Sequence, residues 1–171
     1  MKKLACMILA VLLAALLTSC VFPGYKLKPG DKLGDMEFTN NYELCPGPNF
    51  SDICGFSTLT DGTCLIPVSI PVFWISIGWA EDTQDELELD WKDSVWTMTF
   101  DGHKVDLTKF GTYDWELDGQ LTRSWEVCIS NPAVGKHIVY YEYEFFNGVH
   151  LGKRHSTLIF TVAEASIMPT P

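Results

Sequence analysis

Hydrophobic and polar residues alternate along much of this chain, in short segments that are separated by turn residues. The clearest segment is residues 137–146, where the apolar side is formed by Val139, Tyr141, Tyr143 and Phe145. A strand places every second side chain on one face, whereas a helix would scatter these four residues around its circumference. The segment is therefore predicted to be a half-buried strand.

The same pattern predicts further strands over residues 36–39, 65–70, 72–80, 95–100, 105–107, 121–129 and 156–163. Turn signals separate them, at Asp101-Gly102, Asn131-Pro132 and Asn147-Gly148. Pro67 and Pro71 confine the segment 65–70 to a sheet edge or to separate short strands, because proline cannot donate a hydrogen bond to a neighbouring strand. On the segment 121–129, Arg123 is a misfit on an otherwise apolar face.

Two stretches break the strand pattern. Residues 45–64 are rich in Cys, Gly, Pro, Asp and Ser, and they are predicted to form an irregular excursion. Residues 81–93 contain seven acidic side chains and one basic side chain. Their apolar residues alternate as in a strand, but Thr83 could also cap a helical turn. Both structures stay open here, and a short helix or loop is favoured.

Seven or eight short strands with frequent turns predict an all-β fold, an antiparallel β-sandwich over residues 36–163. Residues 132–141 (Pro-Ala-Val-Gly-Lys-His-Ile-Val-Tyr-Tyr) resemble the E–F corner and F strand of immunoglobulin-like domains. With Gly78-Trp79-Ala80 and the Asp101-Gly102 hairpin, they are similar to secreted bacterial immunoglobulin-like domains. The resemblance implies that residues 156–163 form the G strand, next to the F strand.

The N-terminus has the parts of an export signal. Two lysines follow Met1, an almost wholly apolar run extends from Leu4 to Leu17, and Leu17-Thr18-Ser19-Cys20 comes next. The apolar run is shorter than the roughly 20 residues of a permanent membrane-spanning helix. Residues 1–19 are therefore interpreted as a cleaved signal peptide. The sequence Leu-Thr-Ser-Cys resembles the lipobox of bacterial lipoproteins.

The lipobox resemblance implies that Cys20 becomes the first residue of the mature chain and carries a diacylglyceryl group. Two acyl chains are enough for stable anchoring. We therefore expect an exported lipoprotein held on the outer side of a bacterial membrane, at the cell surface or the outer membrane. Residues 20–35 then form a tether and residues 164–171 a polar tail. The alternative is an ordinary signal peptide with Cys20 as a spare thiol.

Charge narrows the choice of partners. The net charge is −10, and removal of residues 1–19, which hold Lys2 and Lys3 and no acid, changes it to −10 − 2 = −12. A surface this negative repels a phosphate backbone, so nucleic acid is excluded as a partner. Cations, basic proteins and neutral ligands such as glycans remain.

Four cysteines remain once Cys6 leaves with the signal peptide and Cys20 carries lipid, and they are Cys45, Cys54, Cys64 and Cys128. An even number in an exported domain predicts two disulfides. Three pairings are possible, and Cys45–Cys54 with Cys64–Cys128 is favoured. A local pair forms readily, and the second pair would attach the end of the excursion to a core strand. A zinc site is disfavoured because closely spaced cysteine pairs are missing.

One segment resembles the start of a calcium loop. Asp114, Glu116 and Asp118 offer oxygen ligands at alternate positions, and a glycine follows where such a loop turns sharply. The acid expected at the twelfth loop position is replaced by Trp125. The alternative is a solvated strand edge that ends in an Asp-Gly turn. The acidic run 81–93 is a second candidate, although such runs more often form a solvated face. No other cofactor is expected.

The chain has six tryptophans, a large number for its length. Exposed tryptophan rings stack on sugar rings, and Trp91 and Trp115 are candidates because they stand among acidic residues. Trp79 and Trp125 fall on apolar faces. The alternative for all of them is a place in the core.

Catalytic patterns are missing from the sequence. It contains no G-x-S-x-G, no H-E-x-x-H and no glycine-rich phosphate loop. Among the histidines, His150 and His155 flank Lys153 and Arg154, which is typical of a solvated basic patch. We expect a noncatalytic binding or structural module whose partner is an unknown envelope protein or a glycan. A carbohydrate-binding module is the alternative, and an accessory subunit of an envelope enzyme is a further one.

Overall fold

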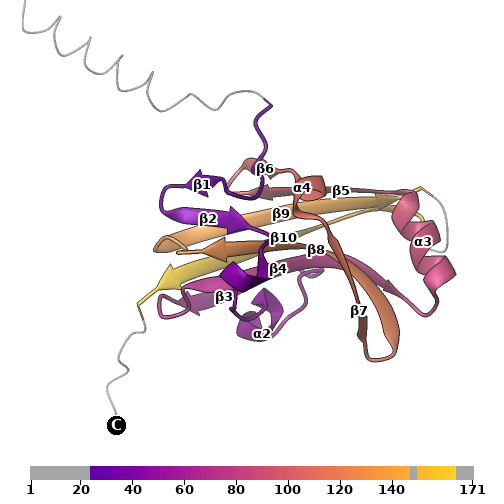
Figure 1. Cartoon of the computed structure of the whole chain (residues 1–171), viewed down its shortest axis with the longest axis horizontal. Helices are drawn as coiled ribbons and strands as arrows, with labels where there is room; N and C mark the ends of the chain where they lie inside the picture. The colour runs from indigo at the N-terminus through magenta and orange to yellow at the C-terminus, as the bar shows by residue number, and fades with distance from the viewer. Residues whose placement is uncertain (1–23, 147–149, 165–171) are drawn as a thin grey trace, which may run out of the picture.

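The computed structural model describes residues 24–146 and 150–164, which form two β-sheets that share one hydrophobic core (Figure 1). The predicted signal peptide, Cys20, the Asn147-Gly148 turn and residues 165–171 lie outside this described part. None of the described helices has the length and apolar character needed to cross a membrane.

The first sheet, which we call the pocket sheet, is built around β8 (Gln120–Ser130). One edge of β8 pairs with β4 (Val72–Glu81), and its other edge pairs with β2 (Met36–Thr39) and β7 (Thr112–Leu117). The short strand β1 (Lys32–Leu33) pairs with β2. All of these pairs are antiparallel. The pocket sheet is therefore antiparallel throughout, as the sequence predicts.

The second sheet has the order β3–β10–β9–β5–β6. Its strands are β3 (Gly62–Pro67), β5 (Ser94–Phe100), β6 (His103–Val105), β9 (Gly135–Phe145) and β10 (Gly152–Ala163). The predicted neighbours β9 and β10 pair antiparallel, with Leu158 opposite Val139.

The prediction of a wholly antiparallel sandwich is wrong for one pair, because β3 runs parallel to β10. These two strands are far apart in sequence, so no tight hairpin forces them to be antiparallel. β3 lies at the sheet edge and ends at Pro67, as the proline predicts.

The core lies between the two sheets and follows the alternation in the sequence. Side chains on the inner face of β9 are at most 5% exposed, and Leu158, Phe160 and Val162 of β10 are fully buried. From the pocket sheet, Phe73 and Ile75 meet them, and the Phe73 and Phe160 rings pack edge to face at 5.5 Å. Each fully buried side chain of this size contributes about 1.5–3 kcal/mol.

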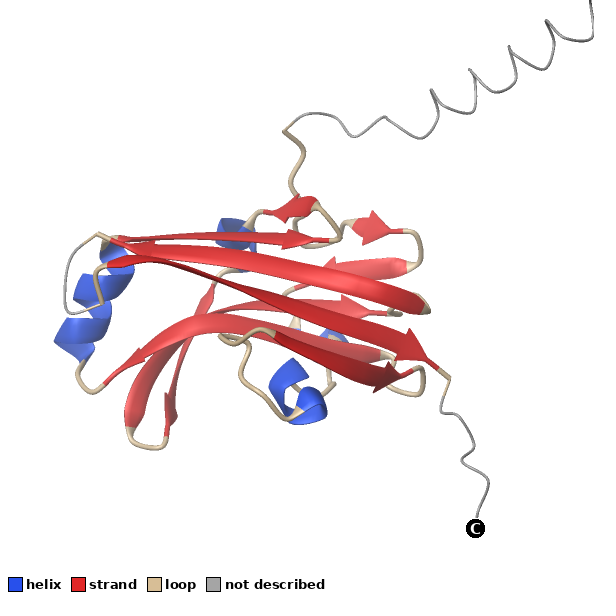
Figure 2. Ribbon diagram, turned by 180° about the vertical axis from the view of Figure 1, so that it is seen from behind, coloured by secondary structure: helices blue, strands red, loops and turns tan. Residues whose placement is uncertain are grey.

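The acidic run folds as a helix, α3 (Gln84–Lys92), at one end of the two sheets (Figure 2). The Thr83 side chain accepts a hydrogen bond from Glu86 N, and the Glu86 carboxylate accepts one from Thr83 in return. This N-cap satisfies one of the free N–H groups of the first turn, and the second hydrogen bond joins the Thr83 hydroxyl to the Glu86 carboxylate. Leu87 and Asp90, three residues apart, form the buried face. The favoured helical structure is thus confirmed.

Two other short helices escape the sequence prediction. The helix α2 (Phe50–Cys54) lies within the excursion, and α4 (Leu107–Phe110) takes the end of the predicted strand 105–107. In the segment interpreted as a calcium loop, the strand β7 forms a hairpin with β8, which confirms the alternative of a solvated strand edge that ends in an Asp-Gly turn. The 3₁₀ turn η1 (Tyr42–Leu44) follows β2.

Packing begins within the predicted tether. Leu27 is 1% exposed, its N–H donates to Lys104 O at 2.7 Å, and its carbonyl accepts from Asp106 N at 2.7 Å. The folded unit therefore includes residues that precede position 36.

The four cysteines of the described residues are all paired, as predicted, but the favoured pairing is wrong. The disulfides are Cys45–Cys128 and Cys54–Cys64. Cys128 lies on the outer face of β8, where Trp74 Nε1 donates to Cys45 O at 2.8 Å and holds residue 45 beside it. Cys54 ends α2, and the chain then returns as β3. The local pair is thus a helix-to-strand contact that the sequence pattern did not show.

Candidate functional site

A pocket lies on the outer face of the pocket sheet, away from the core. Alternation along β4 sends Ile75 and Ile77 into the core and leaves Ser76 and Gly78 on the outer face. On β8, Thr122 and Ser124 share that outer face. The floor of the pocket is therefore made of small side chains, which leave room above the sheet.

The pocket has a volume of about 300 Å³ and carries no charged side chain. Six of its side chains are hydroxyls, one is an amide and two are indoles; the lining residues are Asn49, Ser51, Ser57, Thr58, Leu59, Ser76, Gly78, Trp79, Ala80, Trp115, Leu117, Thr122 and Ser124. We call it the tryptophan–hydroxyl pocket. Its size is at the lower end of the range of small-molecule sites in proteins.

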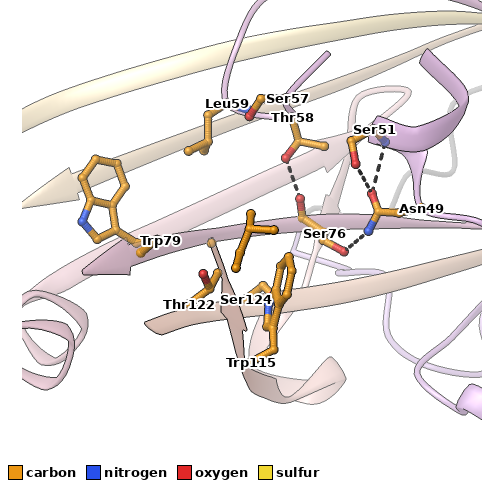
Figure 3. Close-up of a pocket in the computed structure, with 13 residues that line it drawn as sticks. Asn49, Ser51, Ser57, Thr58, Leu59, Ser76, Trp79, Trp115, Thr122 and Ser124 are labelled. Carbon is orange, nitrogen blue, oxygen red and sulfur yellow. Dashed lines mark hydrogen bonds between the residues drawn. The ribbon is translucent and has the colours of Figure 1, made fainter. Parts of the chain in front are cut away.

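Trp115, on β7, forms one wall of this pocket (Figure 3). Its side of β7 faces outward, and 43% of the residue is exposed. Its Nε1–H donates to Ser124 Oγ at 3.3 Å, and Ser124 Oγ donates to Glu126 Oε1 at 3.2 Å. This chain of hydrogen bonds holds the indole ring in place while part of the ring stays open to solvent.

The opposite wall comes from α2 and the loop before β3, and hydrogen bonds attach it to the sheet (Figure 3). Asn49 Nδ2 donates to Ser76 Oγ at 2.5 Å, while Asn49 Oδ1 accepts from Ser51 Oγ at 3.0 Å. Thr58 Oγ1 donates to Ser76 O at 2.6 Å. Because the Cys54–Cys64 disulfide also closes this loop, the wall is held from two sides.

Thr122 is different from the other hydroxyls of the pocket. Its Oγ1 is buried and has no hydrogen-bond partner among the described residues. A buried hydroxyl without a partner costs about 1–3 kcal/mol, and such groups usually satisfy themselves with water or a ligand. Because this oxygen is covered in the structure, a ligand hydroxyl would reach it only after the side chains around it move.

Gly78 keeps the floor low where β4 and β8 meet. A Cβ at this residue would lie 2.1 Å from Arg123 O and 2.6 Å from Ser124 Cα. Any larger residue would push the two strands apart. The glycine thus preserves both the strand pairing and the depth of the pocket.

The structure separates the two predicted glycan-binding tryptophans. Trp115 lines the pocket, whereas Trp91, on α3, packs at 5.5 Å from Trp96 and 5.4 Å from Trp125. Arg123 lies 5.9 Å from the Trp91 ring centroid. The faces of Trp91 are thus covered by other side chains. A second cavity of about 530 Å³ borders this cluster. Its lining combines aromatic side chains with the charged side chains of Lys26, Lys104 and Asp106.

The calcium candidates do not converge on one point. Asp114 and Glu116 lie on β7, and Asp118 follows in the turn to β8, with a positive φ of 52°. Asp114 is bound to Arg123, whose Nε and Nη2 donate to it at 2.6 Å each. The hydrogen bonds from Arg123 lower the pKa of the Asp114 carboxyl. Asp114 is therefore engaged in an ion pair on a hairpin.

Arg123 is no misfit, because it joins two elements. Besides Asp114, it binds both oxygens of Glu88 on α3, at 3.0 and 2.8 Å. Its hydrogen bonds lower the pKa of the Glu88 carboxyl as well. The guanidinium connects the β7–β8 hairpin to the helix at the end of the sandwich. Hydrophobic alternation could not reveal this role.

Within the acidic run, Glu81 and Asp90 come together with His150, and their ligand-forming atoms all lie within 4.8 Å of one another. His150 Nε2 lies 3.2 Å from Glu81 Oε1. Burial raises the pKa of the Glu81 carboxyl, and the hydrogen bond from Trp79 opposes this shift. The solvated basic patch predicted around His150 is therefore wrong for this residue, whose ring packs 4.8 Å from that of Trp79.

Sequence reasoning found Trp115 and missed the hydroxyl residues of the pocket. Ser76, Thr122 and Ser124 are the polar members of alternating strands, and that pattern alone assigns them to a solvated face. The one available signal was their small size, since a solvated strand face usually carries longer polar side chains. Asn49 and Thr58 belong to the excursion, whose position depends on the disulfides.

Comparisons with known proteins do not assign the chain. No family model matches it, and no curated protein matches it. Among solved structures, it resembles the cysteine protease inhibitor EhICP2 from Entamoeba histolytica at 12% identity, with a TM-score of 0.32, over 61% of this chain and 88% of that one. It also resembles PbICP-C, solved in complex with falcipain-2, at 13% identity and a TM-score of 0.35, over 68% of this chain and 99% of that one. TM-scores this low support neither a shared fold nor a shared function.

Proposed function

We propose that this protein is a noncatalytic binding module, exported and anchored to the outer side of a bacterial membrane through lipid on Cys20, that binds a neutral glycan in the tryptophan–hydroxyl pocket. The observation that carries the ligand class is the open Trp115 ring beside the unpartnered Thr122 hydroxyl. A sugar ring offers an apolar C–H face for stacking and hydroxyls at its edge for hydrogen bonds. The pocket provides both kinds of contact within one wall and floor.

The absence of charge from the pocket lining favours a neutral sugar over an ionic ligand. The chain carries a net charge of −10, and none of that charge enters the pocket. Hydroxyl groups in protein sites act as both donors and acceptors, which matches the hydroxyls of a sugar.

The binding test uses the mature domain with its disulfides intact. Neutral oligosaccharides, such as glucans, mannans and galactans, are titrated while tryptophan fluorescence and binding heat are recorded. We expect binding that Trp115→Ala weakens by about fivefold or more, because a ring stacked on an aromatic face gains of the order of 1 kcal/mol or more. Tyr25→Ala is the matched control, because Tyr25 is 51% exposed and is not part of the pocket.

Two outcomes would contradict the glycan proposal. One is that no neutral oligosaccharide binds to the folded domain. The other is that binding occurs and Trp115→Ala leaves it unchanged, which would move the ligand to another surface. The anchoring part of the proposal is then untouched, because it depends on Cys20 alone.

The anchoring is tested in cells by mass spectrometry of the mature N-terminus. We expect a diacylglyceryl adduct on Cys20 and release of Cys20→Ser from the membrane fraction. An unmodified N-terminus at another residue would refute the lipoprotein proposal. Membrane attachment would place the pocket outside the cytoplasm, where disulfides persist.

We further propose that the fold is related to immunoglobulin-like domains. The chain leaves the pocket sheet at the end of β8, passes through Pro132 to Gly135, and enters the second sheet as β9. This crossing, with β9 and β10 as neighbours, supports the resemblance of residues 132–141 to an E–F corner. An experimental structure with a different strand order would refute it.

A further inference from the structure

A second cluster of functional side chains lies at one end of the sandwich, on the rim next to α3. Glu81 ends β4, Asp90 lies on the buried face of α3, and His150 comes just before β10. Three segments that are distant in sequence therefore bring their side chains to one point. The ligand-forming atoms of these residues all lie within 4.8 Å of one another.

The cluster places two carboxylates in a poorly solvated position without a basic side chain to neutralise them. Asp90 is 5% exposed and the Glu81 side chain 14% exposed. In the described part of the chain, no lysine or arginine forms an ion pair with either of them, and His150 is the one basic partner. Buried carboxylates that lie this close together repel one another unless a proton or a cation lies between them.

The surroundings hold the three side chains in place. Trp79 Nε1 donates to Glu81 Oε1 at 2.5 Å, which orients that carboxylate. The His150 ring packs against the rings of Trp79 and Phe145, with centroids 4.8 and 6.3 Å away. Hydrogen bonds and packing of this kind orient the ligands in metal sites and strengthen metal binding.

We propose that Glu81, Asp90 and His150 form a binding site for a divalent transition-metal ion of the zinc type. Zinc ligands at about 2.0–2.2 Å in a tetrahedral shell lie roughly 3.3–3.6 Å from one another. His150 Nε2 and Glu81 Oε1 are already 3.2 Å apart. Small side-chain adjustments therefore bring the three ligands around one ion.

The ligand set decides between metal classes. Calcium takes 6–8 oxygen ligands, so a site with an imidazole nitrogen and two carboxylates suits it poorly. One imidazole and two carboxylates suit zinc and its first-row neighbours. Three protein ligands leave the fourth tetrahedral position for water. The site is separate from the glycan proposal, although Trp79 touches both places.

The test uses the mature protein, freed of metal by dialysis against a chelator and then titrated with ZnCl₂ in a calorimeter. We expect one zinc ion per chain, with a rise in Tm because zinc binds the folded state. Glu81→Gln, Asp90→Asn and His150→Gln should each weaken zinc binding by more than about tenfold. The first two keep side-chain size, and His150 has a side-chain exposure of 31%, so each variant should fold.

Two control variants distinguish binding at this site from nonspecific zinc binding elsewhere on the surface. His155→Gln removes an exposed histidine on β10, and Asp85→Asn removes an exposed acid on α3. Both should bind zinc as the unmodified protein does. Circular dichroism and Tm confirm that each variant is folded. The proposal is overturned if the folded protein binds no zinc, or if His155→Gln weakens binding as much as His150→Gln. These measurements need no glycan, so their failure leaves the pocket proposal standing.

Discussion

Trp115 and the cluster of Trp91, Trp96 and Trp125 show two different uses of the same side chain. The Trp96 ring stacks on Tyr143 at 4.8 Å and on Trp91 at 5.5 Å, and Trp91 in turn lies 5.4 Å from Trp125. Trp115 lies on the outer face of its sheet, and its neighbours in the pocket are mainly hydroxyl groups. In the cluster the ring faces are occupied by other rings, whereas Trp115 keeps a face available to a ligand.

This difference teaches that the number of tryptophans is a poor guide to binding. Trp91 and Trp115 are both surrounded by acidic residues in sequence, and the same interpretation covered both. The acids near Trp91 lie on α3, whose other side faces the end of the sandwich. Burial of the cluster stabilises the fold, whereas the exposed part of the Trp115 ring is free to contact a ligand. Four substitutions test this division.

The largest effect on stability is expected from Trp96→Ala. This change removes stacking on Trp91 and Tyr143 and the hydrogen bond from Nε1 to Ser94 Oγ at 2.8 Å. Large aromatic-to-alanine changes in cores cost about 3–5 kcal/mol, and Trp96 is only partly buried, so we expect the lower end of that range. Urea unfolding measures it. A loss similar to that of Trp115→Ala would remove the distinction between the two regions.

The second effect concerns Arg123, which covers the Trp91 ring and binds Asp114 and Glu88. Arg123→Met should lower Tm by a few degrees at neutral pH. The pKa values of both carboxyls are lowered by hydrogen bonds from Arg123. Groups with a lowered folded pKa stabilise the protein above their unfolded values, about 3.9 for Asp and 4.3 for Glu. That stability is lost as pH falls through the folded values.

The difference in Tm between the unmodified protein and Arg123→Met should therefore shrink toward zero in acid. Thermal unfolding across a pH series measures it, and Arg154→Met on β10 is the control for loss of an exposed arginine. A difference that stays constant with pH would show that Arg123 acts through packing on Trp91 instead of through its carboxylate partners.

The third effect is a gain. Thr122→Val replaces a buried hydroxyl that has no partner among the described residues with a methyl group of the same shape. Without ligand, we expect stability to rise by about 1 kcal/mol, because an unsatisfied polar group is removed. Glycan binding should weaken in the same variant. Ser124→Ala is the contrasting change, since Ser124 Oγ has two hydrogen bonds to lose. A destabilised Thr122→Val would mean that the hydroxyl already has a partner.

The smallest effect on stability is expected from Trp115→Ala. The residue is 43% exposed and its one hydrogen bond, to Ser124, is 3.3 Å long. Substitutions at such surface positions usually change stability by less than about 0.5 kcal/mol. Its effect on glycan binding should be the largest of the four. If urea unfolding shows a loss above 1 kcal/mol, Trp115 is part of the structural framework.

Periodicity predicted the strands well where one face is buried. The alternation of Val139, Tyr141 and Tyr143 in the sequence matches the alternation of buried side chains in β9. The turn predicted at Asp101-Gly102 does join β5 to β6. It did not detect β7, in which every residue except Tyr113 is exposed. A strand with both faces largely in solvent has no apolar side for periodicity to detect.

Only one residue of the candidate site could be predicted from the sequence. Trp115 could be proposed from its acidic neighbours, although the structure surrounds its ring with Ser124 and Thr122 from β8. The position of Ser124 and Thr122 beside the ring depends on the register of the β7–β8 hairpin, in which Trp115 lies opposite Thr122. The contact of His150 with Glu81 and Asp90 could not be predicted from the sequence either. The strand β4, the helix α3 and the segment before β10 come together only when the two sheets pack.

The sequence by itself determined the local properties of this protein: the alternation of its strands, the capping of α3 by Thr83, and the even number of cysteines in the domain. Each of these depends on residues a few positions apart. Only the tertiary structure decided which cysteines pair, why β3 runs parallel to β10, and which tryptophan keeps an open face. These outcomes depend on contacts between segments that are far apart in the chain, and such contacts are selected by packing of the whole core, which no local pattern contains.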